Sequence, residues 1–399
     1  MRIRSLGTGL AVVALVVGAC SSSPGGSAGA TAKPKPSVPA SIGPGEGKLN
    51  LVAWSSYVVG GSGGEKIEGA PDWVTPFETE TGCKVTVKVG TGSSEMVELM
   101  KTGQYDGVSA SGDATLRLIA GGDVAAVNTD LIPNYKNIFE GLKLQKHNSV
   151  DGVAYGIPHG RGANLLLFRS DIVPETTDSW SVVFDGGSKY KGKITAYDYE
   201  IYIADAAVYL MATKPELKIT NPYALDATQF KAAVDLLKEQ RKNITTYWSA
   251  PQAQIDAFTS GDMVAGTTWQ YQVNVLTAAK VPVKGIKPKE GTTGWSDTWM
   301  ISSKAKNPNC MYLWMNYMAS PVANATATVW FGEAPTSPQA CAEAEKQSPG
   351  HCDTFHATDE AYFKDVWYWN TPTKDCLDGR GPICTEFSEW TKAWTEIKG

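Results

Sequence analysis

Short apolar or alternating runs recur along the chain from residue 49 onward, with segments of helical spacing between them. Residues 49–54, 83–89 and 105–108 predict strands, whereas residues 72–78 and 94–102 predict helices. The same order continues with expected strands at 192–196 and 264–269 and expected helices at 204–212, 226–243 and 308–330, the last broken near Ser320. Strands that alternate with helices at this spacing predict βαβ units and a largely parallel sheet, so we expect an α/β fold.

The first residues of the chain follow a different pattern. A basic start precedes an uncharged apolar run at residues 10–18, which is typical of a secretory signal and too short to span a bilayer as a mature helix. Residues 17–20, Val-Gly-Ala-Cys, resemble the lipobox of bacterial lipoproteins, although Val stands where Leu is more usual. The resemblance implies a signal peptide at residues 1–19 and a lipid on Cys20 that anchors the protein to the extracytoplasmic face of the cell membrane. An ordinary cleaved signal with an incidental Cys20 is the alternative.

The charge and apolar content of the chain indicate which kinds of partner it can bind. The chain has 36 basic and 41 acidic residues and a formal net charge of −5. Its Lys and Arg residues form no cluster, which argues against nucleic acid as a partner and favours cationic partners. Hydrophobic residues make up 42% of the 399 residues, enough for two globular lobes. No segment after the leader approaches the roughly 18 apolar residues of a transmembrane helix, so we expect no further membrane span.

The cysteines predict disulfide bonds. Without Cys20, an even six of the seven cysteines remain: Cys83, Cys310, Cys341, Cys352, Cys376 and Cys384. An even count in an exported protein favours disulfides, although the count alone leaves the pairing open. Short separations suggest Cys341–Cys352 and Cys376–Cys384, which leaves Cys83–Cys310 as a long-range bond. A zinc site is the rival, but no two cysteines have the C-x₂₋₄-C spacing.

Three patterns have the form of catalytic sites but lack an essential part. Residues 60–64 match G-x-S-x-G around Ser62, yet four glycines favour a flexible loop over the strained turn of a nucleophile elbow. Residues 187–193 nearly match a phosphate-binding loop, but Ile194 stands where Ser or Thr would hold magnesium. The four His residues form no H-E-x-x-H set. We therefore expect no enzyme, no catalytic residue, no cofactor and no metal.

Aromatic, acidic and amide side chains lie beside the ends of expected strands. They are Trp54 and Tyr57, Ser111 and Asp113, Asp198 and Glu200, Trp269 and Gln272, and Trp295 and Asp297. In open α/β sheets ligands bind at the carboxyl ends of strands, so these side chains can converge on one cleft. Aromatic faces attract cations, and carboxylates hydrogen-bond to ammonium groups. The set predicts a box for an elongated amine; the alternative is that each aromatic is an ordinary core or surface residue.

Several short segments stand along the chain in an order and spacing that are specific in combination. They are W-x-x-Y at residues 54–57, Y-D at 105–106, Y-x-I-P at 155–158, Y-K-G-K-I at 190–194, P-K-E-G at 288–291, W-x-D at 295–297 and P-T at 335–336. Over residues 49–340 the chain thus resembles the spermidine/putrescine-binding proteins of ABC importers. The resemblance implies a two-lobed type II periplasmic-binding-protein fold, a small cationic amine as ligand in the cleft between the lobes, and membrane-bound ABC permease subunits as partners. It also implies a monomer.

The resemblance assigns roles to the matching residues. It implies that Asp297, in the W-x-D segment, is the principal acceptor for an ammonium group of the ligand. It further implies that Trp54, Tyr57, Trp269 and Trp295 form an aromatic box that stacks on the methylene groups.

Other candidates follow the family pattern less closely. Ser111 and Asp113 fall on a second binding loop, although the family often has an aromatic residue where Asp113 stands. Asp198 falls near the acid of the other lobe, and Glu200 is adjacent to the position of the family's second acid there. Gln272 stands where some members carry an acid.

The expected layout of the chain combines these observations. The Ser-, Gly-, Ala- and Pro-rich segment after the signal predicts a flexible tether. The chain should cross between the lobes near Pro158 and Trp295, and the disulfide-rich C-terminal region should pack on the second lobe. The expected parts are the tether at residues 20–48, the first lobe at 49–157 and 297–340, the second lobe at 158–296 and the C-terminal region at 341–399.

Three alternatives stay open at this point. The first is a binding protein for another solute, such as an amino acid derivative, an aminophosphonate or ferric iron. Iron would need clustered tyrosine oxygens, for which Tyr197, Tyr199 and Tyr202 are the group to inspect. The second is an exported hydrolase that uses Ser62, and the third is an envelope scaffold without a deep cleft.

Overall fold

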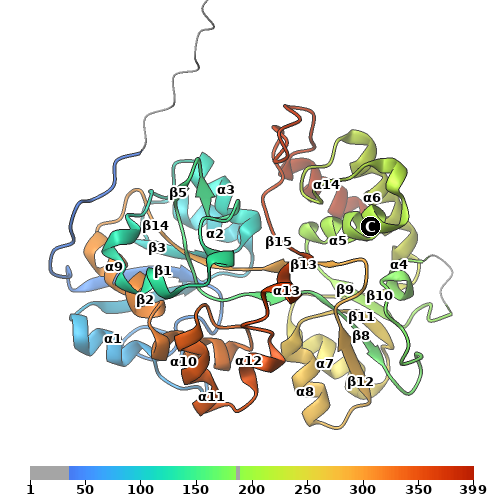
Figure 1. Ribbon diagram of the computed structural model, residues 1–399, viewed down its shortest axis with the longest axis horizontal. Coiled ribbons are helices and arrows are strands. Elements are labelled where there is room, and N and C mark those ends of the chain that lie inside the picture. The colour runs from blue at the N-terminus through green and yellow to red at the C-terminus, as the bar shows by residue number, and fades with distance from the viewer. Residues whose placement is uncertain (1–35, 186–188) are drawn as a thin grey trace, which may run out of the picture. The chain divides into compact units, whose positions relative to one another are not determined.

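The computed structural model of the protein describes residues 36–185 and 189–399. The expected signal peptide, Cys20 and most of the expected tether lie outside the described residues. The unit from Ser37 to Gly399 is built around two five-stranded sheets (Figure 1). We call each sheet with its covering helices a lobe.

The first lobe contains the sheet with strand order β2-β1-β3-β14-β6. β1 is parallel to β2 and β3, whereas β14 is antiparallel to β3 and β6. Leu49 and Leu51 of β1 belong to one apolar cluster and Val52 to another, so both faces of this strand are covered. The strands are β1 (Lys48–Ala53), β2 (Lys84–Val89), β3 (Gly107–Ala110), β6 (Ile157–Pro158) and β14 (Thr298–Ile301).

The second lobe contains the sheet with strand order β10-β9-β11-β8-β12. β9 is parallel to β10 and β11, and β8 is antiparallel to β11 and β12. Leu166 and Phe168 of β8 face one apolar cluster, and Leu165 and Leu167 face another. The strands are β8 (Leu165–Arg169), β9 (Ile194–Tyr197), β10 (Ile244–Trp248), β11 (Ala265–Thr268) and β12 (Val283–Ile286).

Helices cover both sheets, and none of those in the described ranges is long and apolar enough to cross a membrane. Those of the first lobe are α1 (Val74–Thr81), α2 (Ser93–Lys101), α3 (Gly112–Ala120), α9 (Pro308–Met318) and α10 (Pro321–Phe331). Those of the second lobe are α4 (Ser181–Phe184), α5 (Ile203–Thr213), α6 (Ala227–Arg241), α7 (Pro251–Ser260) and α8 (Gln270–Ala278). The helices and strands expected from the sequence are confirmed, including the break of the long helical stretch at Ser320.

Small sheets lie along the connections. β7 (Gly162–Ala163) and β13 (Thr292–Trp295) pair with each other, and they lie on the two chain segments that connect the lobes. β15 (Val366–Tyr368) pairs in parallel with β13, so a third segment joins this connection. A separate two-stranded sheet contains β4 (Ser149–Val150) and β5 (Val153–Ala154).

The C-terminal region does not pack on the second lobe as a whole, and our expectation for residues 341–399 needs correction. α11 (Pro338–Gln347) and α12 (His351–Thr354) pack beside α10, because small residues such as Ala325 of α10 and Ala344 of α11 allow a close approach. The rest of the region does contact the second lobe. Phe363, at the end of α13 (Glu360–Phe363), packs on an apolar cluster of that lobe, Arg380 pairs with Asp226, and α14 (Phe387–Lys398) packs on α6.

Three disulfides confirm the pairing expected from the sequence. Cys83–Cys310 joins the end of α1 to α9, with a sequence separation of 227. Cys341–Cys352 and Cys376–Cys384 close short loops with separations of 11 and 8. The two short bonds stabilise the C-terminal region, and the long one joins distant parts of the first lobe.

The different loop lengths predict different effects on stability. Replacing Cys83 and Cys310 together by Ser should lower the free energy of unfolding by about 5 kcal/mol, because the bond restricts a long unfolded loop. The same change at Cys376 and Cys384 should cost about 2–3 kcal/mol. Urea unfolding of the two double variants measures both values, and an equal or larger loss for the short loop would contradict this expectation.

Candidate ligand-binding site

Asp297 and Tyr57 form a buried pair in the first lobe. Tyr57 lies in the loop after β1, and Asp297 stands between β13 and β14. The Tyr57 hydroxyl donates to Asp297 Oδ2 at 2.9 Å, while Oδ1 has no hydrogen-bond partner among the described residues. Burial raises the pKa of Asp297 to about 6, and the nearby hydroxyls of Ser111 and Tyr57 counteract this in part. Asp297 therefore has one oxygen positioned by Tyr57 and one oxygen free to bind a donor.

Asp113 is a second buried acid of the first lobe. It lies in the first turn of α3, after Ser111, and its Oδ1 accepts a hydrogen bond from Ser93 Oγ at 3.0 Å. Its Oδ2 has no partner among the described residues. Burial raises the pKa of Asp113 to about 7, with smaller contributions of the same sign from Glu200 and Asp297.

Glu200 brings a third carboxylate from the second lobe. It begins the short 3₁₀ helix Glu200–Tyr202 after β9 and is buried. Thr391 of α14 donates to its Oε1 at 3.3 Å. Burial raises the pKa of Glu200, and the charges of Arg117 and Lys398 lower it. Because Glu200 and Asp297 both act on Asp113, the carboxylates of the two lobes share one region of negative potential.

Aromatic rings of the second lobe and the connecting strand lie beside these acids. The Trp269 ring centroid is 5.0 Å from that of Trp248, 5.6 Å from that of Tyr197 and 6.2 Å from that of Trp295. Tyr197 also stacks on Trp369, at 5.7 Å and an interplanar angle of 18°. The charges of Asp113, Asp297 and Glu200 all raise the pKa of Tyr197, after burial, so the aromatic group borders the acidic one.

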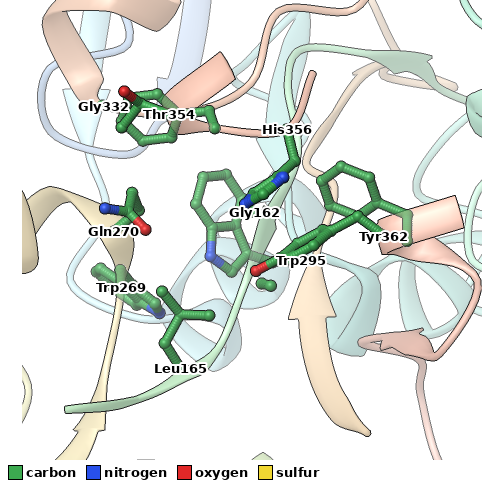
Figure 2. A pocket seen from close by; sticks show the side chains of 12 residues that line it. Gly162, Leu165, Trp269, Gln270, Trp295, Gly332, Thr354, His356 and Tyr362 are labelled. Carbon is green, nitrogen blue, oxygen red and sulfur yellow. The ribbon is translucent and has the colours of Figure 1, made fainter. Parts of the chain in front are cut away.

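Two small cavities lie at the aromatic group, and Trp269 lines both. Each has room for about one water molecule, so the aromatic side chains pack closely on one another. The cavity of about 20 Å³ (Figure 2) is lined by Gly162, Ala163, Leu165, Trp269, Gln270, Trp295, Gly332, Thr354, Phe355, His356, Tyr362 and Phe363. The cavity of about 10 Å³ is lined by Asn164, Tyr197, Tyr202, Asp205, Trp248, Thr267, Thr268 and Trp269.

Two of the residues expected in the site have other partners, and a third has no ring contact with the aromatic group. Asp198 Oδ1 accepts hydrogen bonds from Lys398 Nζ at 2.7 Å and Trp394 Nε1 at 3.1 Å, so it holds α14 in place. Gln272 is fully buried and donates to Gln254 of α7 at 3.2 Å, which directs it into the second lobe.

Trp54 is the third of these residues. It is half-buried against the apolar clusters of the first lobe and has no close ring contact with another aromatic residue of the described chain. The structure therefore brings together Tyr57, Ser111, Asp113 and Asp297 from the first lobe. Glu200, Trp269 and Trp295 join them from the second lobe and the connection.

Several residues of this region were missed by sequence reasoning. Tyr197 follows an expected strand together with Asp198 and Glu200 but is not among the residues predicted to bind the ligand, and Trp369 lies beyond the segment that the resemblance covers. Asp205, on α5, accepts a hydrogen bond from Thr293 at 2.8 Å, and burial raises its pKa to about 7. Glu333, two residues beyond α10, is fully buried near Asp297. Position relative to the expected strands could have drawn attention to Tyr197, but no pattern distinguishes Asp205 or Glu333.

The residues of the rival sites have other partners. The Ser62 hydroxyl donates to Glu78 at 2.5 Å, so it is bound to a carboxylate and not to a histidine base. The Tyr202 hydroxyl accepts a hydrogen bond from Gln240 at 2.9 Å in the core of the second lobe. It therefore does not face the same point as Tyr199, whose pKa is raised by burial and then by the charges of Asp113 and Glu200.

The fold and site define a class of protein. The structure resembles the spermidine/putrescine ABC transporter substrate-binding protein PotD from Streptococcus pneumoniae, with a TM-score of 0.66 and 17% identity. The match covers 88% of this chain and 97% of that one, and it shows the two-lobed fold of periplasmic binding proteins. Residues 72–354 match the model of the bacterial extracellular solute-binding proteins, and the chain belongs to this family.

Curated relatives match most of the chain. The putrescine-binding periplasmic protein SpuD of Pseudomonas aeruginosa is 26% identical over 371 residues, which are 88% of this chain and 91% of that one. The putrescine-binding periplasmic protein PotF of Escherichia coli is 25% identical over 321 residues, which are 76% of this chain and 82% of that one. Both relatives are named for the binding of a solute.

The raised pKa values of the site predict an unusual dependence of stability on pH. An acid whose pKa is higher in the folded than in the unfolded protein stabilises the fold while it is protonated, and this contribution is lost as the pH rises. For Asp113 the loss should extend from about pH 4 to about pH 7.

Asp113→Asn should therefore lose less stability than the wild type between pH 4.5 and 8. The difference should be about 1–3 kcal/mol, measured by urea unfolding without ligand. If the free energies of unfolding of the two proteins changed in parallel between pH 4.5 and 8, Asp113 would be ionised in the folded protein over this whole range, and the expectation would be wrong.

Proposed function

We propose that this extracellular solute-binding protein takes a linear cationic amine of the putrescine/spermidine class and delivers it to an ABC permease. The observation that carries the proposal is the surplus of negative charge in the site. Asp113, Glu200 and Asp297 are buried together, whereas the cations that act on them are Arg117 and Lys398. A buried carboxylate is stable only if it is protonated or paired, so a cationic ligand fits this group.

The names of two relatives support the same ligand class. SpuD and PotF are putrescine-binding proteins, and both match over most of their length. One fold serves many ligands, so the side chains of the site decide the chemistry. A carboxylate-rich site with aromatic walls suits an amine better than an anionic solute such as an aminophosphonate.

Each residue has a distinct role in this proposal. Oδ1 of Asp297 accepts a hydrogen bond from an ammonium group, while Tyr57 holds the carboxylate through Oδ2. Trp269 and Trp295 stack on the methylene chain. Asp113 and Glu200 lie toward the other end and attract the second charge.

Closure of the two lobes follows from the placement of these residues. Asp113 and Asp297 belong to the first lobe and Glu200 to the second, so one ligand bridges both. The cavities of about 10 and 20 Å³ at the aromatic group are smaller than a diamine, so the lobes must separate for entry. A ligand that contacts both lobes favours the closed form, which the permease then recognises as a monomeric receptor.

The sharpest test of the site compares two acids, Asp297 and Asp198, that the resemblance assigns to the ligand-binding region. Asp297→Asn removes the charge but keeps the shape, and it should weaken binding of putrescine and spermidine about ten- to a thousandfold. Asp198→Asn is the matched control and should bind both amines as the wild type does, because Asp198 is paired with Lys398. Isothermal titration calorimetry measures the affinities.

The possible outcomes separate the ligand from the residue assignment. If the wild type binds neither amine at millimolar concentration, the ligand class is wrong and a thermal-shift screen of other solutes follows. If Asp297→Asn and Asp198→Asn are weakened equally, the acidic site is not where we place it.

We also propose that the protein is lipid-anchored through Cys20 on the extracytoplasmic face of the cell membrane. The support is the signal-like start of the chain and the small residues before Cys20. Cys20→Ser should block processing or release the protein from the membrane fraction. Fractionation and immunoblotting test this, and normal processing with full membrane retention would contradict the anchor.

A further inference from the structure

Glu333 is a buried acid that has no role in the proposed function. Its side chain is fully buried, two residues beyond the end of α10. Neither carboxylate oxygen has a hydrogen-bond partner among the described residues. Burial, and then the charge of Asp297, hold the pKa of Glu333 well above its usual range. A buried polar group without a partner is rare and costly, so this one requires an explanation.

The histidines near Glu333 do not neutralise it. His159 Nε2 lies 3.4 Å from Glu333 Oε1 but forms no hydrogen bond there. His159 Nδ1 accepts a hydrogen bond from the Trp299 indole at 3.0 Å, so the ring is a neutral tautomer with its proton on Nε2. Burial also lowers the pKa of His159 to about 3. His351 contacts only the backbone oxygen of Glu333, at 2.9 Å.

Arg161, two residues after His159 in the sequence, does not neutralise Glu333 either. Arg161 pairs with the backbone of Ala334, next to Glu333, but its guanidinium is bound to Glu360 at 2.7 Å and to the Ala357 carbonyl at 2.8 Å. Within residues 36–185 and 189–399, the charged and titratable groups beside the Glu333 carboxylate are thus Asp297, Tyr57 and His159, and none of them supplies a positive charge.

Glu333 belongs to the same buried cluster as Asp297. The charges of Asp297 and Glu333 both raise the pKa of the Tyr57 hydroxyl that donates to Asp297, after burial. The backbone N–H of His159 donates to the Asp297 carbonyl at 2.8 Å. Beside it, a Cβ on Gly160 would lie 2.2 Å from Glu333 Oε2, so only glycine leaves space for this carboxylate. Both acids therefore border the ring pair of Tyr57 and His159, whose centroids are 4.2 Å apart.

We propose that Glu333 is a second carboxylate of the amine site, which carries a proton without ligand and releases it to solvent when an ammonium group binds beside Asp297. The inference rests on the proposed function. It explains why an unpaired acid is retained in the core, since its partner is the ligand. It also predicts that amine binding is coupled to the release of protons, because a carboxyl that was neutral becomes the ionised partner of a cation.

The test combines affinity with proton counting. Putrescine is titrated calorimetrically at pH 7.5 in phosphate and in Tris, and the difference in binding heat gives the number of protons released. Glu333→Gln should weaken putrescine about ten- to hundredfold and release fewer protons than the wild type. Glu78→Gln is the control: Glu78 is also buried in the first lobe, but Ser62 and Val85 donate to its Oε1. It should retain both the affinity and the proton count.

Three results would overturn this inference in distinguishable ways. If the wild type does not bind putrescine or spermidine, the proposed function fails and this role fails with it. If the wild type binds and Glu333→Gln matches it in affinity and proton release, only the role of Glu333 is wrong. If Glu333→Gln does not fold, Glu333→Asp replaces it, and it should keep the proton release while binding more weakly. Loss of the proton release in Glu333→Asp would then contradict the inference.

Discussion

The burial of several carboxylates close to one another is the physical constraint on which this structure depends. Burial raises the pKa of Asp113, Glu200 and Asp297, so each is easier to protonate than a free acid. At Asp113 the charges of Glu200 and Asp297 add to this effect. Such a group destabilises the protein unless protons or a cation neutralise it. In the function that we propose, a cationic ligand supplies this neutralisation, so the site selects for charge before shape is considered.

The rest of the fold holds these acids in place and excludes water from them. Parallel strands bring Tyr57 and Ser111 to one end of the first sheet, and β9 brings Glu200 to the facing end of the second. The tryptophans of the connection and of the second lobe pack on one another, with ring centroids 5.0 and 6.2 Å apart. The C-terminal region adds a third chain segment to the connection between the lobes, because β15 pairs with β13 and α14 packs on α6.

Local sequence patterns predicted much of this arrangement, and the limits of that prediction are physical. Alternating and helical spacing identified the strands and helices of both lobes, and the W-x-x-Y and W-x-D segments identified Tyr57 and Asp297, 240 residues apart. Asp198 and Glu200 are two residues apart, and only the packing of α14, through Lys398, decides which one is paired. Gln272 faces Gln254, a choice set by the contact between α7 and α8. An isolated acid such as Glu333 shows its burial only after the chain has folded.

A charge series of linear ligands tests the central claim most directly. Putrescine, 1,4-butanediol and succinate have four-carbon chains but carry two positive charges, none and two negative charges. If buried carboxylates select the ligand, calorimetry at pH 7.5 should detect binding of putrescine and no binding of the diol or the diacid at the same concentrations. Binding of succinate or butanediol as tight as that of putrescine would show that charge neutralisation of Asp113, Glu200 and Asp297 does not drive recognition.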